Sequence, residues 1–397
     1  MKVALVVYGS RGDVQPMLAL ATGLMDKGYE VVFCASPDNE EFVKSHHCPF
    51  EPFGKNLKEL FSKANVKGGI SAQMSPKEGR QIIAEQIEKL PEKVKGSDLI
   101  LAAGIILGVP TVADYLNIPY RFVAFYPMIL GTSKEDPLFN RTMFRFGRFI
   151  INLFTKGYIN SQRQRLGIQP IKDVWQYWMG DNVITACDRE LNAVKEGVSF
   201  KYTQTGYMIL SAHDKLQPRV EDFLASGKPP VYIGFGSNPI SGKKEFGDIF
   251  NKVFEDTQQR LIISKGWADL PSGDQPNILF VDDIPFNSLF PKVSAIIHHG
   301  GTGTMAYAAR SGVPQAAFPF IADQFENRKQ IVRLGLGPET CDFKKMTAAS
   351  LSSAIIACIT NDDFKKNAIA ISKKLEQTDG LQLTVDVIER ALSEPLS

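Results

Sequence analysis

The sequence has no long apolar run, few cysteines and no large excess of charge of either sign. No apolar run approaches the ~20 residues that a membrane-spanning helix needs. The five cysteines are scattered and form no CxxC pair, which is typical of reduced thiols in a cytoplasmic protein. Lys and Arg number 45 against 43 Asp and Glu, so the net charge of +2 gives no reason to expect a nucleic acid as partner.

Signals for sorting and for metal binding are missing as well. The apolar start of the chain, VALVV, is not followed by the small-residue cleavage site of a signal peptide, and we expect none. The segment HHC at 46–48 holds adjacent histidines, which suit a single metal ion poorly. We therefore expect no metal site.

What the sequence does contain is a repeated α/β pattern over 397 residues, a length that suits two domains. Short runs rich in Val, Ile and Phe alternate with longer helical patterns, as is typical of parallel strands buried on both faces. The first half has predicted strands at residues 2–9, 29–36, 98–105, 120–127, 182–188 and 201–208. The second half has them at residues 231–237, 260–266, 277–283, 294–301 and 314–320.

These two sets of strands predict an α/β fold in which two Rossmann-like domains face each other across a cleft. The N-terminal domain is expected to span residues 1–213 and the C-terminal domain residues 214–380. Residues 214–230 are polar and carry prolines, which predicts a linker. Ligands of such sheets bind at the carboxyl ends of the strands, so polar residues that directly follow a strand are candidates for a site.

The turn YGSRGDVQP, residues 8–16, joins the first predicted strand to the first predicted helix. Turns at this place usually cradle phosphate, but this one carries the carboxylate of Asp13. It does not match GxGxxG, and the second strand does not end in an acidic residue, so a nicotinamide dehydrogenase is disfavoured. Asp13 has two interpretations: a base that serves a ligand, or an N-cap of the helix that begins with VQPMLALATGL.

The segment HHGGTGTMAYAARSGVP, residues 298–314, carries the strongest signal for a ligand. Its first residues end a strand, and the glycine-rich GGTGT then opens a helix. Free backbone N–H groups and the positive end of the helix dipole would bind an anion there, and His299 could donate a hydrogen bond to the same anion. The alternative is a glycine-rich turn beside a structural histidine.

Asp323 and Gln324 follow another predicted strand, 24 positions after His299. Together they offer acceptors and a donor that suit the hydroxyl groups of a sugar held beside phosphates. The alternative is a helix cap, in which Asp323 caps QFENRKQIVRLG. The two interpretations are compatible with each other.

The motif HHGGTGT…SGVPQAAFPFIADQ resembles the nucleotide-sugar signature of the UDP-glycosyltransferase superfamily, whose fold is called GT-B. GSRGDVQP narrows the resemblance to the sterol glucosyltransferases and the glycopeptide-antibiotic glycosyltransferases. GKPPVYIGFGS and LFPKVSAIIHHGG are similar to the same families. The resemblance covers nearly all of the second domain, but in the first domain it fades after the opening turn and helix.

This resemblance assigns a donor site to residues of both domains. The groups expected at the diphosphate are Ser237, His299 and the amides of Gly301, Thr302, Gly303 and Thr304. Asp323 and Gln324 are expected at the sugar; Trp267, Val281 and Ile284 at the nucleobase; and Ser10, Arg11 and Gly12 at the donor from the opposite domain. Val281 stands where the plant-type signature has a uracil-stacking Trp, and Tyr307 where it has a ribose-binding Glu. Because of these departures, the preference for uridine is less well supported by the sequence than the diphosphate site.

The activity implied by the resemblance is an inverting transfer of a sugar, by this likeness glucose, from a UDP-sugar to a hydroxyl group of a lipophilic acceptor such as a sterol or another terpenoid. The N-terminal domain would bind the acceptor, and Asp13 would take the proton of its hydroxyl group. No cofactor is needed, because the UDP-sugar is a co-substrate. The last helix, residues 381–397, is implied to cross back onto the N-terminal domain.

Several alternatives remain open at this point. The acceptor could be a polyketide, a glycopeptide or a lipid natural product instead. The same scaffold could carry a nucleotide-sugar epimerase or a glycosidic phosphorylase, although GSRGDVQP speaks against both. A non-catalytic sugar-nucleotide-binding protein is the alternative from another class.

Residues 141–172 form a basic and apolar stretch with seven basic residues and no acidic residue. Phe and Ile residues are interleaved with the charges. The first interpretation is a helix that faces the core and leaves its basic face in solvent. The second is a surface that lies on anionic lipid, which predicts a cytoplasmic protein with a peripheral membrane contact.

Overall fold

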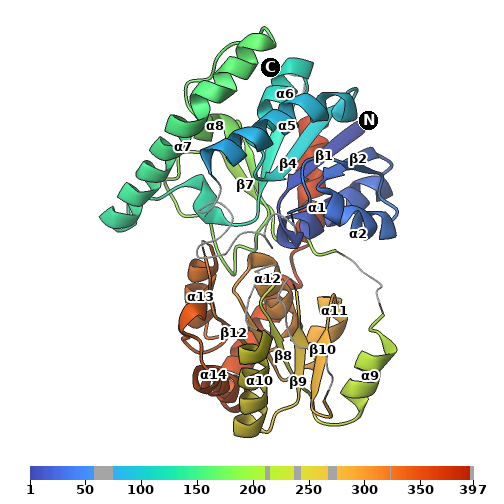
Figure 1. Ribbon diagram of the computed structural model, residues 1–397, viewed down its shortest axis with the longest axis vertical. Helices are drawn as coiled ribbons and strands as arrows, with labels where there is room; N and C mark the ends of the chain where they lie inside the picture. The colour runs from blue at the N-terminus through green and yellow to red at the C-terminus, as the bar shows by residue number, and fades with distance from the viewer. Residues whose placement is uncertain (58–74, 211–214, 237–242, 267–274, 322, 394–397) are drawn as a thin grey trace.

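The computed structural model describes residues 1–57, 75–210, 215–236, 243–266, 275–321 and 323–393. Two α/β units lie one above the other along the long axis of the molecule, each built around a parallel sheet (Figure 1). The predicted fold of two Rossmann-like domains is confirmed. Within the described residues, no helix combines the length and the apolar character that a bilayer span requires.

The N-terminal sheet has seven strands in the order β3-β2-β1-β4-β5-β6-β7, all paired in parallel where registers are formed. The strands are β1 Lys2–Tyr8, β2 Glu30–Ala35, β3 Phe50–Pro52, β4 Leu99–Gly104, β5 Tyr120–Ala124, β6 Val183–Thr185 and β7 Tyr202–Gln204. Six of them lie within the predicted ranges. The edge strand β3 was not predicted, because three residues, the last of them a proline, give no periodic pattern.

The C-terminal sheet has five parallel strands in the order β10-β9-β8-β11-β12. They are β8 Val231–Gly234, β9 Leu261–Ser264, β10 Ile278–Val281, β11 Ala295–His298 and β12 Gln315–Ala317. All five lie within predicted ranges. Their residues are almost entirely buried, because helices cover both faces of the sheet.

Helices connect the strands in both units. In the N-terminal unit they are α1 Arg11–Asp26, α2 Glu40–Ser45, α5 Pro76–Val94, α6 Val109–Leu116, α7 Leu138–Arg165 and α8 Val174–Met179. From there on they are α9 Pro218–Ala225, α10 Lys243–Thr257, α11 Phe286–Leu289, α12 Thr302–Ser311, α13 Asp323–Arg333, α14 Ala348–Thr360, α15 Asp362–Leu375 and α16 Gly380–Ser393.

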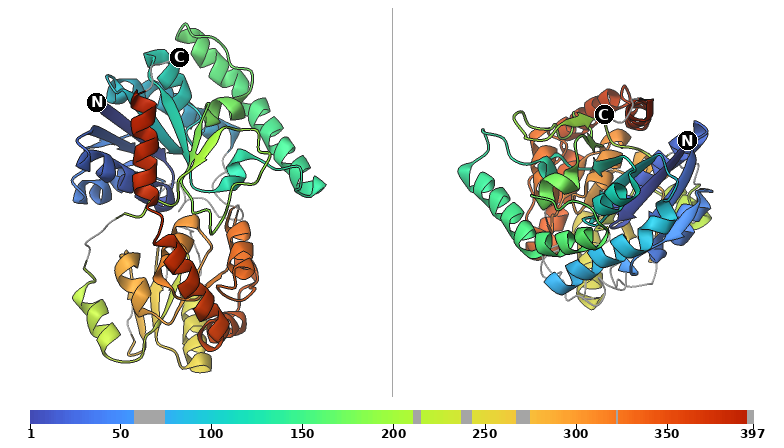
Figure 2. Two further views of the ribbon diagram at one scale, coloured as in Figure 1. Left: turned by 180° about the vertical axis from the view of Figure 1, so that it is seen from behind. Right: turned by 90° about the horizontal axis from the view of Figure 1, so that it is seen from above.

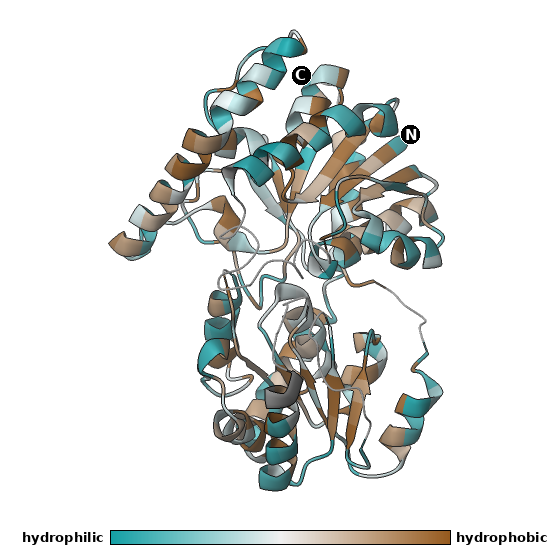
Figure 3. Ribbon diagram, in the orientation of Figure 1, coloured by the Kyte–Doolittle hydropathy of each residue, from teal (hydrophilic) through white to brown (hydrophobic). Residues whose placement is uncertain are grey.

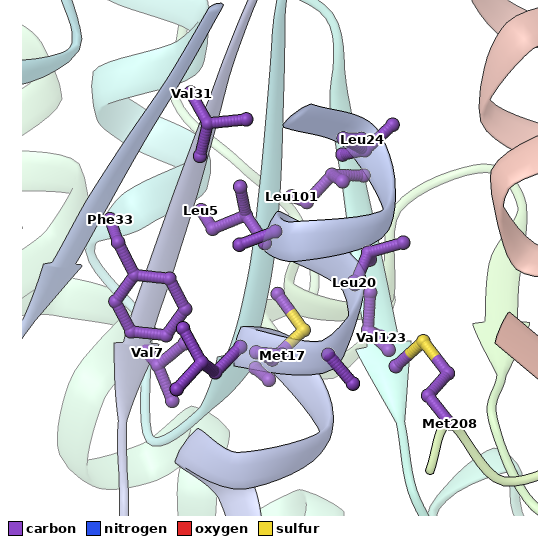
Figure 4. Close-up of a cluster of buried hydrophobic side chains, with 14 of the residues drawn as sticks. Leu5, Val7, Met17, Leu20, Leu24, Val31, Phe33, Leu101, Val123 and Met208 are labelled. Atoms are coloured by element: carbon purple, nitrogen blue, oxygen red, sulfur yellow. The ribbon is translucent and has the colours of Figure 1, made fainter. Parts of the chain in front are cut away.

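Helix α1 packs on the centre of the N-terminal sheet and fixes the turn before it. Met17, Leu20 and Leu24 point from α1 toward strand residues such as Leu5 and Phe33, and all are fully buried (Figure 4). The hydrophobic effect of this burial amounts to about 1.5–3 kcal/mol for each large side chain. The position of the turn between β1 and α1 is therefore set by the core below it.

Helix α16 lies on the N-terminal unit, although the chain reaches it from the C-terminal unit (Figure 2). Val385 and Ile388 are buried in the same hydrophobic core as α1. The Thr384 Oγ1 hydroxyl donates to Thr205 Oγ1 at 2.8 Å. A Cβ atom at Gly23 would stand 3.1 Å from Leu381 Cδ1, so glycine allows the two helices to approach closely.

The segment predicted as a linker, residues 214–230, is only partly irregular. Its centre forms α9 Pro218–Ala225, and Leu216 and Val220 are buried in the C-terminal core. The expected boundary between residues 213 and 214 lies outside the described residues. Two buried apolar residues thus anchor part of this segment to the C-terminal unit.

Helix α7 corrects the first interpretation of the basic stretch 141–172. Only Ile159 and Arg163 of this helix are fully buried, both in its second half. Phe146 and Phe149, in its first half, expose 56% and 59% of their surfaces. A helix whose apolar residues face the core is therefore wrong for the first half of α7.

Candidate active site

The carboxyl ends of both sheets meet where the two units touch. Helix α1 begins after β1, helix α12 begins after β11, and the two helices are in contact. The Gln15 Nε2 amide on α1 donates to the Tyr307 hydroxyl on α12 at 2.8 Å. The turn that carries Asp13 and the loop that carries His299 therefore lie on the two sides of one boundary.

The turn before α1 is held by a reciprocal cap. The helix begins at Arg11, with Ser10 as the N-cap residue. Asp13 Oδ2 accepts from the Ser10 backbone N–H at 2.9 Å and lies 3.4 Å from Ser10 Oγ. The prediction that Asp13 is itself the N-cap is wrong, because the helix starts earlier and Asp13 sits in its first turn.

Gly9 gives the Asp13 side chain its space. A Cβ atom at residue 9 would stand 2.2 Å from Asp13 Oδ2, which no side chain tolerates. Burial raises the pKa of Asp13 to about 6, the Ser10 backbone N–H opposes this rise, and the charge of Asp323 adds to it. A carboxylate with this pKa is ionised at neutral pH and is a competent proton acceptor there.

His299 is enclosed by two glycines of the C-terminal unit. A Cβ atom at Gly301 would stand 2.4 Å from His299 Nε2, and one at Gly236 would stand 2.6 Å from its Cε1. Gly236 also has a φ of +64°, which favours glycine. Burial lowers the pKa of His299 to about 4, and a hydrogen bond to the Gly234 backbone opposes this shift. The ring is therefore neutral with one N–H, and its Nδ1 has no partner among the described residues.

His298, by contrast, supports the loop from inside the core. Its Nδ1 accepts from the Gly300 backbone N–H at 3.1 Å, so its Nε2 carries the proton that Gln315 Oε1 accepts at 2.9 Å. Burial lowers the pKa of His298 to about 3. Of the two histidines, His299 is the one able to serve a ligand.

Helix α12 presents an uncapped N-terminus at this place. Gly301 is its N-cap, and within the described residues no side-chain cap hydrogen bond is formed there. The amides of Thr302, Gly303 and Thr304 thus keep their donors, and the helix dipole favours an anion. Gly303 allows close packing, because a Cβ atom there would stand 2.7 Å from the Tyr207 hydroxyl.

Asp323 and Gln324 begin α13 next to this loop. Asp323 Oδ2 accepts from Thr302 Oγ1 at 3.2 Å, and burial raises the pKa of Asp323 to about 6. Gln324 Oε1 accepts from the backbone N–H groups of Phe320 at 2.8 Å and Ile321 at 3.2 Å. The carbonyl of Gln324 is therefore engaged in its own loop, which leaves the amide nitrogen as the group that could bind a sugar.

The residues predicted at the nucleobase and the second diphosphate contact are placed only in part. Val281 and Ile284 expose 2% and 9% of their surfaces and belong to the C-terminal core. Ser237 and Trp267 lie outside the described residues. Arg11 reaches this region from the opposite unit, where it pairs with Asp283 at 3.1 Å. Gly12 is exposed at the start of α1, and its N–H donates to the Ser10 hydroxyl at 3.3 Å.

Three features of the site were missed by sequence reasoning. Asn327 is buried, and its Nδ2 donates to the Gly300 carbonyl at 2.8 Å and to Thr302 Oγ1 at 3.1 Å. Its position one helical turn after Asp323 was the available signal.

Arg310 and Asp188 form a two-pronged ion pair between the units, with both distances at 2.7 Å. The Tyr307 hydroxyl oxygen accepts from the Gln15 Nε2 amide and also from the Leu210 backbone N–H, the latter at 3.2 Å.

Among the described residues, no group of three or more His, Cys, Asp or Glu side chains could hold a metal ion together. The site consists instead of two partly buried carboxylates, a neutral histidine and the N-terminus of a ten-residue helix. It can bind an anion on the C-terminal side and can accept a proton on the N-terminal side.

Two family models match this chain, one in each unit. Residues 3–128 match the N-terminal domain of glycosyltransferase family 28. Residues 263–378 match the C-terminal domain described as erythromycin biosynthesis protein CIII-like. The first match extends well beyond the opening turn and helix, where the resemblance seen in the sequence faded.

Relatives match the chain over nearly its whole length. Vancomycin aglycone glucosyltransferase of Amycolatopsis orientalis is 31% identical over 99% of this chain and 98% of its own. The chain belongs to the same family of glycosyltransferases as this relative. Sterol 3-beta-glucosyltransferase UGT80B1 of Arabidopsis thaliana is 30% identical to this glycosyltransferase, and the match covers 100% of this chain and 69% of the relative's chain. The resemblance to antibiotic and sterol glycosyltransferases is confirmed.

A solved structure shows the same architecture. The calicheamicin glycosyltransferase CalG4 superimposes with a TM-score of 0.75 over 100% of this chain and 99% of its own, at 16% sequence identity. This likeness concerns the fold and supports the GT-B arrangement of the two units in this glycosyltransferase.

Proposed function

We propose that this glycosyltransferase moves glucose from UDP-glucose to a hydroxyl group of a lipophilic acceptor, with inversion at the anomeric carbon. The observation that carries the proposal is the placement of Asp13 opposite the uncapped N-terminus of α12. An ionised carboxylate on one side and an anion site on the other are what an attacking hydroxyl and a diphosphate leaving group require.

The anion site would bind the diphosphate of the donor. Backbone N–H groups of α12 and the neutral ring of His299 would donate to it, and Ser237 would add a hydroxyl. Ser10, Arg11 and Gly12 would approach the donor from the N-terminal unit. Asp323 and the Gln324 amide would hold the sugar hydroxyl groups, while Trp267, Val281 and Ile284 would surround the nucleobase.

The transfer itself would then run as one displacement. The acceptor oxygen forms a bond to the anomeric carbon as its proton passes to Asp13, and the bond from that carbon to the diphosphate oxygen breaks. The electron pair of the broken bond leaves with the nucleotide diphosphate. His299 and the α12 N–H groups would stabilise the negative charge that develops on it.

A lipophilic acceptor is supported by a relative whose name gives a sterol as its acceptor. Vancomycin aglycone and a sterol are named as acceptors of two relatives. A sterol or terpenoid is our first proposal, and a glycopeptide, polyketide or lipid natural product is the alternative. All five cysteines are free thiols, which supports a cytoplasmic enzyme.

The test is an acceptor screen with UDP-glucose, read by mass spectrometry of the acceptor and by release of UDP. We expect one hexosyl addition to a sterol or terpenoid, with UDP released only when the acceptor is present. dTDP-glucose in a parallel reaction tests the nucleobase. UDP-glucose binding without turnover of any acceptor would contradict the proposal in favour of a non-catalytic sugar-nucleotide-binding protein.

A further inference from the structure

Helix α7 carries the largest group of exposed apolar side chains in the described part of the molecule. Leu138, Phe139, Phe149 and Leu153 expose 73%, 73%, 59% and 60% of their surfaces. The other members of the group on this helix are Met143 at 52%, Phe146 at 56% and Phe154 at 42%. Isolated exposed apolar residues are ordinary, but seven on one helix mark an interaction surface.

These seven side chains share one face of α7, which we call the outer face. Their spacings of three, four and seven residues place them on about half of the helix circumference. The opposite side of the helix is covered by α5 and α8, where Ile159 is buried and the Phe144 ring contacts Trp175 at 5.3 Å. Helix α7 therefore carries apolar residues on both sides, against the protein and toward solvent.

The first half of α7 also stands away from the body of the N-terminal unit. Both side views show its beginning projecting beyond neighbouring helices (Figures 1 and 2). Brown residues mark this projecting part when the molecule is coloured by hydropathy (Figure 3). A projecting apolar face can reach a flat partner without a clash from the rest of the protein.

The charge on α7 is of one sign. The helix has six basic residues and no acidic residue. Arg148 and Arg163 pair with Asp173 and Asp114 on the inner side. Arg145 is exposed beside the outer face, and Lys156 lies half-buried at the same edge. Within the described residues, neither has an acidic partner.

A second copy of the chain is a poor occupant for the outer face. Pairing two α7 helices would bring two sets of basic residues together without any acid from either helix. An anionic surface that also offers apolar volume meets both requirements. A bilayer with acidic lipids is such a surface, since it accepts large apolar side chains below its headgroups and attracts basic side chains at their level.

We propose that the outer face of α7 docks this protein on an anionic membrane surface, with Phe139, Phe146, Phe149 and Leu153 inserted among the lipids and Arg145 and Lys156 at the phosphate level. The helix follows η2 Pro127–Leu130, which leaves the carboxyl end of β5. The docked face is thus connected to the side of the N-terminal sheet where the active site lies. The docking does not depend on the identity of donor or acceptor.

The experiment is vesicle co-sedimentation of the full chain without any sugar nucleotide. Vesicles of phosphatidylcholine alone are compared with vesicles of phosphatidylcholine and phosphatidylserine, at low and at high salt. We expect binding to the anionic vesicles at low salt, weaker binding to neutral vesicles, and release from the anionic vesicles by salt.

Variants assign the binding to the outer face. Phe146→Ser/Phe149→Ser is expected to lower vesicle affinity by about tenfold or more, while the matched control Ile369→Ser/Leu383→Ser, which changes two exposed apolar residues on α15 and α16, binds like the wild type. Arg145→Gln/Lys156→Gln should weaken binding only at low salt. Its control, Lys27→Gln/Lys95→Gln, changes the same charge at two other exposed positions.

Three outcomes would overturn the proposal. One is that the wild-type protein does not bind anionic vesicles at low salt. Another is a Phe146→Ser/Phe149→Ser variant that binds as well as its control. The third is a concentration-dependent dimer in size-exclusion chromatography that this variant abolishes, which would assign the face to a second copy. None of these outcomes bears on sugar transfer, which the acceptor screen tests in detergent-free solution without vesicles.

Discussion

At the scale of the residue, Asp13 serves structure and chemistry from one position. Its Oδ2 completes the cap of α1 through the Ser10 N–H, and its burial holds its pKa near 6. The sequence predicted a functional carboxylate here but misplaced the helix start by three residues, because Ser10 and Asp13 are both good N-cap residues. Only the backbone geometry shows which of them caps.

The pH dependence of activity follows from this pKa. A base must be ionised, so kcat/KM is expected to be level above pH ~7 and to fall about tenfold per pH unit below ~6. The charge of Asp323 contributes to the raised pKa of Asp13. Asp323→Asn removes that charge, so the fall should move to lower pH. An acid limb that disappears in Asp323→Asn would instead assign the titration to Asp323.

His299 is expected to donate to the diphosphate. In His299→Ala the affinity for UDP, measured by calorimetry, should fall roughly 10- to 150-fold, since a hydrogen bond to a charged group contributes ~1.5–3 kcal/mol. His47→Asn is the control, because His47 is exposed just after α2 and Asn tolerates its φ of +57°. Unchanged UDP affinity in His299→Ala would remove this residue from the site.

At the scale of the element, strands were more predictable than the surfaces of helices. Buried parallel strands are continuous apolar runs, so eleven of the twelve lie within ranges that the sequence predicted. The orientation of α7 was not predictable, because basic and apolar residues interleave around the whole helix and both faces are apolar. Which face is covered depends on α5 and α8.

Helix α16 offers a test of the element scale. Ile388 is 1% exposed in the core of the N-terminal unit, whereas Leu383 on the same helix is 43% exposed. Ile388→Ala should lower the free energy of unfolding by ~2–5 kcal/mol and Leu383→Ala by less than ~0.5 kcal/mol, as measured by urea denaturation. Equal effects of the two substitutions would show that α16 does not pack on the N-terminal core.

At the scale of the whole molecule, the contacts between the units could not be predicted. Arg310 and Asp188 are 122 positions apart in the chain, and Tyr307 and Gln15 are 292 apart. No local pattern marks such pairs, because they arise only when two separately folded sheets meet. The glycine loop and the Asp-Gln pair were predictable, since each follows a strand and sheet topology brings strand ends together.

The ion pair between the units should contribute to stability. Asp188 is almost fully buried, so Arg310→Met leaves a buried carboxylate without its partner. We expect a loss of ~3–5 kcal/mol in urea denaturation, against less than ~0.5 kcal/mol for Asp363→Asn, which breaks the exposed pair with Lys366. A loss in Arg310→Met as small as in the control would mean that the pair does not hold the units together.

The central claim is that Asp13 takes the proton of the acceptor while the opposite unit receives the diphosphate. Asp13→Asn tests it directly, because the Asn carbonyl can still accept from the Ser10 N–H but cannot take a proton. The account predicts wild-type thermal stability and UDP-glucose affinity, and a turnover that falls by ~10²–10⁴. Turnover within a few-fold of wild type would contradict it and leave Asp13 as a cap alone.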